Sequence, residues 1–293
     1  MRFGAIDIGS NAMRLLIAEA REEDNHATLK KLTLIRVPVR LGETVFTTGL
    51  VTPLKIKKLS KSISAFRLLM EVYGVEQYRI CATSAMREAR NQAEVVEKVK
   101  ALTGETIQVI DGDEEADLIH STFETLVFDL NKDYLYIDVG GGSTELSLLR
   151  QGKAIHSRSF RIGTVRSLKK KVDDADWQEM LAFAGELGKQ SQGIQAIGTG
   201  GNINKLVKLS PVNNLSGLQF AELSGIMGQL EKVGLKERMR QFDLKADRAD
   251  VIIPAGHIYM DVMKAAGIDE ILVPKLGLSD GIIYDLYKKH RQK

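Results

Sequence analysis

Short apolar and β-branched runs, separated by polar or glycine turns, predict three strands at the start of the chain. They cover residues 3–8, 13–20 and 28–39. A helical pattern follows over 53–72, where apolar residues recur every three or four positions. Thr52 precedes this segment as a candidate N-cap and Pro53 occupies its first position, so the helix begins there.

The same alternation of strand and helix patterns continues to the end of the chain. Between residues 74 and 130 we expect strands at 78–82 and 107–110 and helices at 93–102 and 114–128. The pattern of three successive strands then restarts at 134–139, 144–150 and 154–161. The remainder predicts helices at 177–187, 203–208, 220–230, 248–266 and 278–289, with strands at 194–197 and 270–273.

An internal repeat explains the restart. The stretch FGAIDIGSNAMRLLI resembles LYIDVGGGSTELSLL, and the alignment pairs Asp7 with Asp138 at an offset of 131 residues. Solenoid repeats are far shorter, about 20–50 residues, so this period indicates two similar α/β domains. We place them at 1–124 and 125–293, and the C-terminal helix over 279–293 is free to pack back on the first domain.

Each repeated segment places an aspartate at the end of a strand, followed by a turn of small residues. Glycine turns let phosphate oxygens approach the backbone amides closely, and hydroxyl or amide side chains add donors. A hairpin whose aspartate only hydrogen-bonds its own turn is the alternative for either copy alone, and the matched pair argues against it. The candidate phosphate-binding residues are Ser10, Asn11, Gly140, Gly141, Gly142, Ser143 and Thr144.

The two aspartates also suggest a divalent cation. A carboxylate at a strand end can bind Mg²⁺, directly or through water, and the ion then neutralises phosphate charge. Asp7 and Asp138 are therefore candidate ligands for Mg²⁺ or Mn²⁺.

Two further polar clusters, ATSAMREA and DGDEEADL, each follow a predicted strand, where ligands bind in open α/β sheets. Arg87 in the first cluster has the geometry to bind a phosphate through two nitrogens. In the second cluster four carboxylates within five positions repel one another, which favours proton uptake by one of them. Acidic residues also stabilise a helix start, and that explanation suits Asp113 and Glu114, whereas Glu115 is the candidate base.

Composition and charge narrow the class of protein without naming a function. The chain has 293 residues, is 44% hydrophobic and has a formal charge of +3, a bias too small to indicate a nucleic-acid or membrane partner. The single cysteine, Cys81, excludes an internal disulfide and suits a buried position in a reducing compartment. Because the chain has no apolar run of membrane-spanning length, we expect a cytoplasmic protein.

With these motifs assembled, the chain resembles the exopolyphosphatase and guanosine pentaphosphate phosphohydrolase (Ppx/GppA) family of the actin-like ATPase superfamily. The resemblance extends over nearly the whole chain, through AIDIGSNAMRLLI, ICATSAMREA, DGDEEADLI, YIDVGGGSTELSLL, FRIGTVRSL, IGTGGNINKL and LGLSDGIIYDLY. It implies an α/β fold of two similar actin-like (ribonuclease H-like) domains, with mixed sheets flanked by helices and the active-site cleft between them.

The resemblance also implies roles for particular residues. Glu115 is similar to the family's general base, Arg87 to its phosphate-binding arginine, Asp138 to its magnesium-linked aspartate and Glu145 to the acidic partner of that aspartate. Asp7, Ser10 and Asn11 match the first phosphate loop. Gly200 and Gly201 match a further phosphate-binding turn, although Asn202 stands where the family commonly has threonine. Longer family members add a C-terminal helical domain that these 293 residues do not contain.

The function that follows is magnesium-dependent hydrolysis of the terminal phosphoanhydride of inorganic polyphosphate. Removal of the 5′ terminal phosphate from guanosine pentaphosphate is the alternative within the family, because the pocket is shared. A nucleotide-binding actin-like module that is not a metabolic hydrolase, and a kinase of the same superfamily, are the rivals from other classes. We expect no nucleic-acid or membrane partner, and a homodimer is compatible with the sequence.

Overall fold

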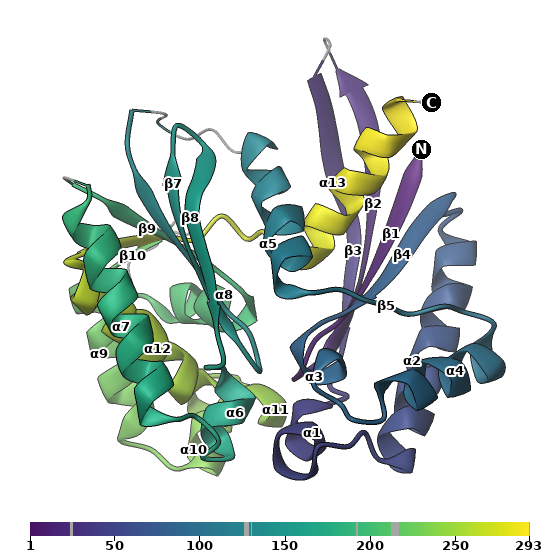
Figure 1. The fold of residues 1–293 in the computed structure, drawn as a ribbon, viewed down its shortest axis with the longest axis horizontal. Helices are drawn as coiled ribbons and strands as arrows, with labels where there is room; N and C mark the ends of the chain where they lie inside the picture. The colour runs from purple at the N-terminus through teal and green to yellow at the C-terminus, as the bar shows by residue number, and fades with distance from the viewer. Residues whose placement is uncertain (24–25, 126–128, 130, 192, 212–216, 293) are drawn as a thin grey trace. The chain divides into compact units, whose positions relative to one another are not determined.

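The computed structural model describes residues 1–23, 26–125, 129, 131–191, 193–211 and 217–292, and the chain divides into two compact units (Figure 1). The first unit consists of Met1–Phe123 and Gly277–Lys293, and the second of Glu124–Leu276. Each contains one mixed β-sheet with helices packed on it. The predicted α/β class with two similar domains is therefore confirmed.

The sheet of the first unit has the strand order β3-β2-β1-β4-β5. Strands β1, β2 and β3 are antiparallel neighbours, whereas β4 runs parallel to β1, and β5 parallel to β4. The strands are β1 (Arg2–Ile8), β2 (Met13–Glu23), β3 (His26–Val37), β4 (Gln77–Ala82) and β5 (Gln108–Val109).

Helices cover both faces of this sheet. The Cα of Gly4 in β1 lies against Met70 of α2 (Pro53–Val72), which packs beside α4 (Gln92–Thr103). The neighbouring Phe3 instead makes an edge contact with Tyr287 of α13 (Leu278–Arg291), with ring centroids 6.2 Å apart. Successive side chains of a strand point to opposite faces, so α2 and α13 lie on opposite sides of the sheet.

The sheet of the second unit repeats this plan in the order β10-β11-β9-β6-β7-β8. Its hairpin has the register of the first at the offset of the sequence repeat, with Asp7 opposite Arg14 in one and Asp138 opposite Glu145 in the other. Its strands are β6 (Tyr134–Val139), β7 (Thr144–Arg150), β8 (Lys153–Phe160), β9 (Gln195–Thr199), β10 (Gly217–Gln219) and β11 (Glu270–Leu272).

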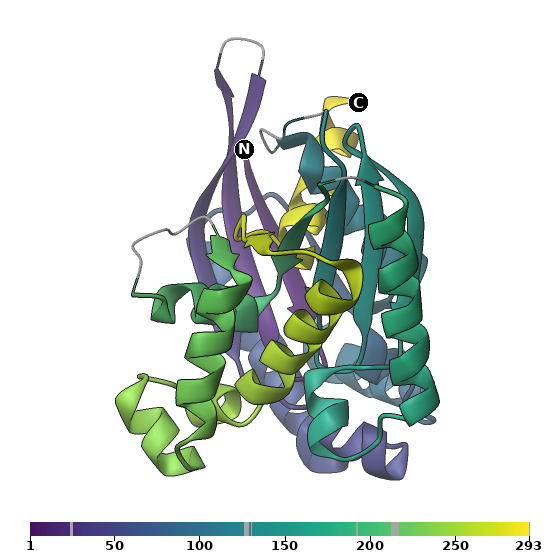
Figure 2. The same ribbon diagram turned by 90° about the vertical axis from the view of Figure 1, so that its left-hand side faces the viewer.

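Helices α7 (Asp174–Lys189) and α9 (Phe220–Glu231) both pack against α12 (Ile252–Ala266), and Figure 2 shows the three in front of the sheet. A continuous apolar core lies between these helices and the central strands, from Leu135 and Ile137 to Ile258 and Val262. The hairpin of β6 and β7 is therefore anchored in a closely packed core, which restricts its movement.

Two predicted helices differ from the structure. The helix expected over 114–128 is α5 (Gly112–His120), followed by the 3₁₀ helix η1 (Ser121–Thr125), and residues 126–128 of that prediction lie outside the described part of the chain. The hydroxyls of Ser121 and Thr122 donate to the carbonyls of Leu118 and Ile119, which tightens the chain where α5 ends.

The helix expected over 248–266 is two helices, α11 (Ala246–Ala249) and α12. Pro254 explains the break, because proline has no N–H for an interior helical bond but is tolerated in the first turn, where α12 places it. The periodicity also missed five short elements: α1 (Gly42–Thr48), α3 (Ser84–Arg87), α6 (Thr164–Leu168), α10 (Leu235–Gln241) and β10.

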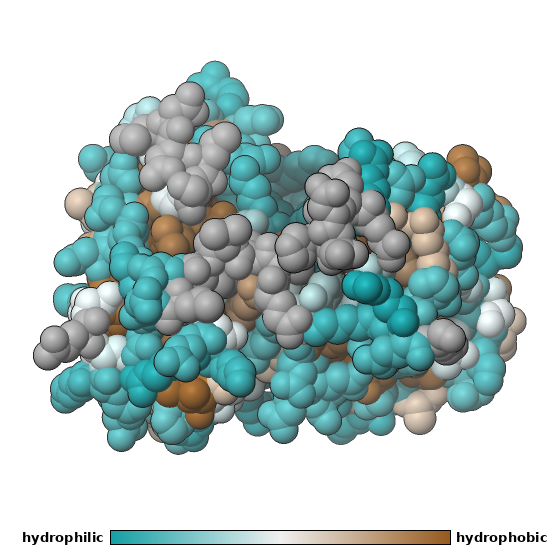
Figure 3. Space-filling view, turned by 90° about the horizontal axis from the view of Figure 1, so that it is seen from above, coloured by the Kyte–Doolittle hydropathy of each residue, from teal (hydrophilic) through white to brown (hydrophobic). Residues whose placement is uncertain are grey.

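Cys81 is a fully buried free thiol in β4, as predicted. Burial raises the pKa of this thiol to about 12, so it stays protonated at neutral pH. The surface drawn in Figure 3 is largely hydrophilic, with small apolar areas between polar residues. Within the described residues, no helix has both the length and the apolar character needed to cross a bilayer.

Candidate active-site residues

Three loops of the first unit leave the same edge of its sheet. The last residues of the parallel strands lie side by side, Ile8 next to Ala82 and Ala82 next to Val109. The turn after β1, the short helix α3 after β4 and the start of α5 after β5 therefore meet at the carboxyl edge, where α/β sheets bind ligands.

The turn after β1 is fixed by backbone hydrogen bonds. The amide of Gly9 donates to the carbonyl of Ala12 over 3.1 Å and closes the turn. The carbonyls of Ser10 and Asn11 accept from the amides of Gly42 (2.9 Å) and Arg40 (2.8 Å), in the segment that follows β3. Its carbonyl groups are thus oriented by the rest of the unit.

Side chains tie this turn to its neighbours. The hydroxyls of Ser10 and Ser84 are 2.9 Å apart, which joins the β1 turn to α3. Asp7, with a side chain 6% exposed, accepts a 2.7 Å hydrogen bond from Arg14 across the hairpin. One carboxylate oxygen of Asp7 is thereby engaged in an ion pair, so the assignment of Asp7 as a metal ligand stays a prediction.

Arg87 and Glu115, predicted as catalytic, lie together at this edge. Nη1 of Arg87 donates to the carbonyl of Ile110 over 2.8 Å and lies 3.6 Å from Oε2 of Glu115. Glu115 is 8% exposed and lies in the first turn of α5, whose N-cap Asp111 accepts a 2.8 Å hydrogen bond from the amide of Glu114 on its carboxylate. A buried carboxylate beside a guanidinium can accept a proton from a bound water.

The turn after β6 repeats the geometry of the first turn. The amide of Gly140 donates to the carbonyl of Ser143 over 2.9 Å, the counterpart of the bond from Gly9 to Ala12. Gly140, Gly141 and Gly142 each have their carbonyl held from α6: by the amide of Thr164 (3.0 Å), the amide of Val165 (2.8 Å) and Nε of Arg166 (2.8 Å), respectively.

The hydrogen bonds to α6 use the carbonyls of the turn and not the amides of Gly141 and Gly142. Among the described residues, no backbone carbonyl accepts from the amides of Gly141 or Gly142, so both suit the anion site predicted for them. Ser143 is buried next to them, and the hydroxyl of Thr144 donates to the carbonyl of Ile162 over 2.7 Å. Thr144 therefore holds β7 to the segment after β8, and its contact with phosphate stays a prediction.

Asp138 and Glu145 form the acidic pair of the second unit. They are directly opposite each other on β6 and β7, so their side chains lie on the same face of the sheet. Glu145 is 4% exposed and accepts a 3.0 Å hydrogen bond from the hydroxyl of Ser159. The equivalent position in the first unit is Arg14, so the pair of opposite charges there is replaced by two carboxylates here.

The β9 turn also approaches Asp138. Gly200 adopts a φ of +106°, which disfavours residues with a side chain, and a Cβ there would lie 3.3 Å from Oδ1 of Asp138. The predicted residues Asp138, Glu145 and Gly200 are thus brought to one place. Gly201 opens α8 (Gly201–Leu209), and its carbonyl accepts a hydrogen bond from Arg248.

Two buried tyrosines are hydrogen-bonded to Thr199, the last residue of β9. The hydroxyl of Tyr136 is 2.6 Å from the hydroxyl of Thr199, and Tyr259 donates to the Thr199 carbonyl. Burial raises the pKa of both phenols well above the usual 10.0, and the charge of Asp138 raises it further. Both hydroxyls therefore stay protonated and keep Thr199 in register opposite Asp138.

The donor chemistry of Asp138 and Glu145 fits a hard divalent cation such as Mg²⁺, which prefers carboxylate oxygens. No group of three or more His, Cys, Asp or Glu side chains suited to a metal occurs in the described part of the chain. Two carboxylates match the usual Mg²⁺ arrangement, in which waters and substrate phosphates supply the remaining ligands.

Sequence reasoning gave no role to three arginines that shape these turns. Arg166 is 4% exposed and holds Gly142, Arg248 holds Gly201, and Arg14 pairs with Asp7. Arg166 and Arg248 are far in sequence from the glycines that they bind, so no local pattern indicates their roles. Arg14 was detectable, because the repeat aligns it with Glu145 and so shows a change of charge at this position.

Comparison with known proteins decides the family. The model of the Ppx/GppA phosphatase family matches residues 17–290. The chain belongs to the Ppx/GppA phosphatase family. This confirms the resemblance found in the sequence and, with the relatives named below, the predicted class of enzyme, a phosphoanhydride hydrolase.

Several known proteins are similar to this Ppx/GppA family member over most of its chain. The bifunctional 3-dehydroquinate synthase/phosphatase of Fusobacterium nucleatum is 28% identical over 92% of the chain, which spans 44% of that protein. Exopolyphosphatase 2 of Mycobacterium tuberculosis is 28% identical, over 97% of this chain and 98% of its own length. The guanosine-5′-triphosphate,3′-diphosphate pyrophosphatase of Aeromonas hydrophila is 24% identical, over 97% of this chain and 59% of its own length.

A solved structure supports the fold of this Ppx/GppA family member. The exopolyphosphatase from Cytophaga hutchinsonii superposes with a TM-score of 0.84 over 99% of this chain and 98% of its own, at 23% identity. At that identity the match establishes the shared fold.

Gly163 offers a test of the turn after β6. A Cβ at this position would lie 2.5 Å from backbone atoms of Gly141 and Gly142. We expect Gly163→Ala to lower the free energy of unfolding by about 1–3 kcal/mol, because the turn has no room to move without losing its bonds to α6. Urea unfolding monitored by circular dichroism measures this change.

Gly225→Ala is the matched control, since a Cβ there meets nothing within 4 Å in α9. We expect it to be neutral or stabilising by up to about 1 kcal/mol, because alanine favours a helix interior. Equal stability of Gly163→Ala and the wild type would show that the turn is not held as described.

Proposed function

We propose that this chain is a divalent-metal-dependent exopolyphosphatase that hydrolyses the terminal phosphoanhydride of inorganic polyphosphate and releases orthophosphate. The observation that carries the proposal is the buried Glu115 beside Arg87 at the carboxyl edge of the first sheet. Membership of the Ppx/GppA phosphatase family and the relative named exopolyphosphatase 2, which matches over almost its full length, support it.

The glycine turn of the second unit binds phosphate in the proposed reaction. Its carbonyls are held by α6, and the amides of Gly141 and Gly142 act as donors to phosphate oxygens. Because these amides are fixed before substrate arrives, little reorganisation is needed when charge develops in the transition state. Ser10, Asn11, Ser143, Gly200 and Gly201 are proposed to add further phosphate contacts.

Asp138 and Glu145 would hold the metal, Mg²⁺ or Mn²⁺. The ion would neutralise phosphate charge and orient the leaving group. The protein contributes the position of the two carboxylates, which the hairpin register and the bond from Ser159 to Glu145 define.

Glu115 acts as the general base. It takes a proton from the attacking water as the water oxygen bonds to the terminal phosphorus, and the bridging oxygen–phosphorus bond breaks to release orthophosphate from the shortened chain. Arg87 keeps the Glu115 carboxylate in place, and its remaining N–H groups can bind a phosphate oxygen.

The first test of the proposal is substrate turnover by the wild-type chain. With Mg²⁺ present, we expect orthophosphate release from polyphosphate with water as the only acceptor, and slower release from guanosine pentaphosphate. Steady-state phosphate assays on both substrates measure the ratio of kcat/KM. Strict dependence on an added hydroxyl or carboxylate acceptor would favour a kinase and reject the proposal.

Guanosine pentaphosphate hydrolysis is the second candidate function, because one relative is named guanosine-5′-triphosphate,3′-diphosphate pyrophosphatase. Glu115 and the turns after β1 and β6 would have the same roles in hydrolysis of the nucleotide. A kcat/KM for the nucleotide about a hundredfold above that for polyphosphate, equivalent to roughly 2.7 kcal/mol in transition-state binding, would make it the principal activity.

The role of Glu115 is tested by Glu115→Gln. We expect kcat to fall by about 10²–10⁴-fold, the usual contribution of a general base, because the amide cannot accept the proton. Substrate binding in the presence of Mg²⁺ should change little, since Gln preserves the shape of the side chain. The control is Asp113→Asn, an exposed carboxylate of the same helical turn, which should retain wild-type kcat. Unchanged turnover in Glu115→Gln would remove the assignment.

The metal assignment is tested by Asp138→Asn and Glu145→Gln. Each variant loses one charge from the acidic pair, so we expect the Mg²⁺ concentration for half-maximal activity to rise at least about tenfold. Direct Mn²⁺ binding, followed by electron paramagnetic resonance, should weaken in parallel. Asp243→Asn is the matched control, because Asp243 is exposed with a φ of +47°, which asparagine also tolerates. Wild-type metal dependence in both acidic-pair variants would place the ion elsewhere.

A further inference from the structure

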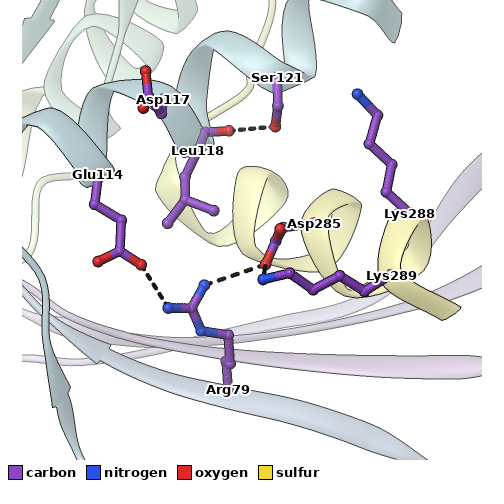
Figure 4. Close-up of a pocket in the computed structure, with 8 residues that line it drawn as sticks. All are labelled: Arg79, Glu114, Asp117, Leu118, Ser121, Asp285, Lys288 and Lys289. Atoms are coloured by element: carbon purple, nitrogen blue, oxygen red, sulfur yellow. Dashed lines mark hydrogen bonds and ion pairs between the residues drawn. The ribbon is translucent and has the colours of Figure 1, made fainter. Parts of the chain in front are cut away.

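A charged pocket lies beside α5, among the residues of the first unit shown in Figure 4. Its volume is about 200 Å³, and its walls come from β4, α5, η1 and α13. Arg79 lies between Glu114 and Asp285 and forms an ion pair with each.

The three guanidinium nitrogens of Arg79 each bind a side chain from a different element. Nη2 lies 2.7 Å from Oε1 of Glu114 on α5, and Nη1 lies 3.3 Å from Oδ2 of Asp285 on α13. Nε donates to the side-chain oxygen of Gln108 on β5 over 2.6 Å. The side chain is 17% exposed, so the guanidinium is enclosed by the groups it binds. Its planar shape sets the directions of these bonds.

Glu114 is the residue immediately before the proposed base. Neighbouring residues on an α-helix point about 100° apart, so fixing the direction of Glu114 also fixes that of Glu115. The two carboxylates are paired with different arginines: Glu114 with Arg79 and Glu115 with Arg87. This separation keeps two adjacent negative charges in defined and different directions.

A second contact joins α5 to α13. A Cβ on Gly281 of α13 would lie 2.1 Å from the carbonyl oxygen of Leu118, so the backbones of α13 and α5 touch there. Asp285 lies one turn after Gly281, and Glu114 one turn before Leu118. The helix that carries Glu115 is therefore attached to α13 at two points, and Arg79 supplies one of them.

We propose that Arg79 is a positioning residue for the reaction: by binding Glu114, Asp285 and Gln108 together, it fixes the orientation of α5 and so the direction in which Glu115 points. This inference rests on the proposed function, in which Glu115 is the base. Glu114 is 44% exposed, so its ion pair adds little to stability, and the effect of Arg79 falls on turnover.

The decisive experiment compares Arg79→Ala in two backgrounds, the wild type and Glu115→Gln. In the wild type we expect kcat for polyphosphate to fall by about tenfold or more with KM changed less than about twofold, because the loss affects the orientation of the base. In the Glu115→Gln background we expect no further loss, because a residue that acts through Glu115 has nothing left to position.

Arg79→Lys and Arg67→Ala complete the design. Lysine keeps the charge but lacks the planar, fixed arrangement of donors with which Arg79 binds its three partners, so it should restore only part of kcat. Arg67 pairs with Glu71 on the exposed face of α2, and its removal should leave kcat and the unfolding midpoint unchanged. If Arg79→Ala does not fold, Glu114→Gln provides the same comparison, with a smaller expected loss of kcat.

Each outcome separates this inference from the proposed function. Wild-type kcat in Arg79→Ala, or equal fold losses in the two backgrounds, would overturn the positioning role while Glu115 remains the base. Loss of kcat in step with the unfolding midpoint, with Arg79→Lys no better than Arg79→Ala, would also overturn it in favour of a structural role. Full activity in Glu115→Gln alone would instead overturn the assignment of the base.

Discussion

The candidate site depends on one backbone constraint, which occurs in both units. The turn after the first strand is closed by one hydrogen bond from a backbone amide. The carbonyls of the turn accept hydrogen bonds from the segment after the third strand. In the first unit the amides of Arg40 and Gly42 hold the turn, and in the second the start of α6 does so. A turn whose carbonyls are fixed has amides that are fixed as well, because both belong to the same planar peptide groups. Such a turn can present donors to an anion without first reorganising.

The two turns share this constraint but differ in charge. Asp7 is neutralised by Arg14, whereas Asp138 faces Glu145 at the equivalent register position. The first hairpin is therefore internally balanced, and the second concentrates negative charge where a divalent cation would be bound. The register position that holds Arg14 in the first hairpin holds Glu145 in the second, so two hairpins of the same fold differ in charge.

The sequence predicted the parts of this arrangement that follow from local patterns. The strands flanking each turn, the long helix α2 and the repeat of 131 residues are all visible as periodicity or identity, and the family motifs identified Glu115, Arg87 and Asp138 as candidates. The short helices α1, α3, α6 and α10 escaped because a few residues define no period. The roles of Arg166 and Arg248 escaped because their partners are backbone carbonyls distant in sequence. Such contacts follow from the fold and leave no local pattern.

The two kinds of site residue are held in different ways, and this bears on how the chemistry is controlled. The turns after β1 and β6 are held by backbone hydrogen bonds, and the second also by the close contact of Gly163 with Gly141 and Gly142. Glu115 lies on a nine-residue helix whose first turn is acidic and is held by arginines and by α13. Backbone bonds in a packed core allow little movement, whereas partly exposed ion pairs are weaker and respond to salt. In the proposed mechanism, phosphate is therefore bound by the more rigid part of the fold, and the direction of Glu115 is set by charges that a single substitution can alter.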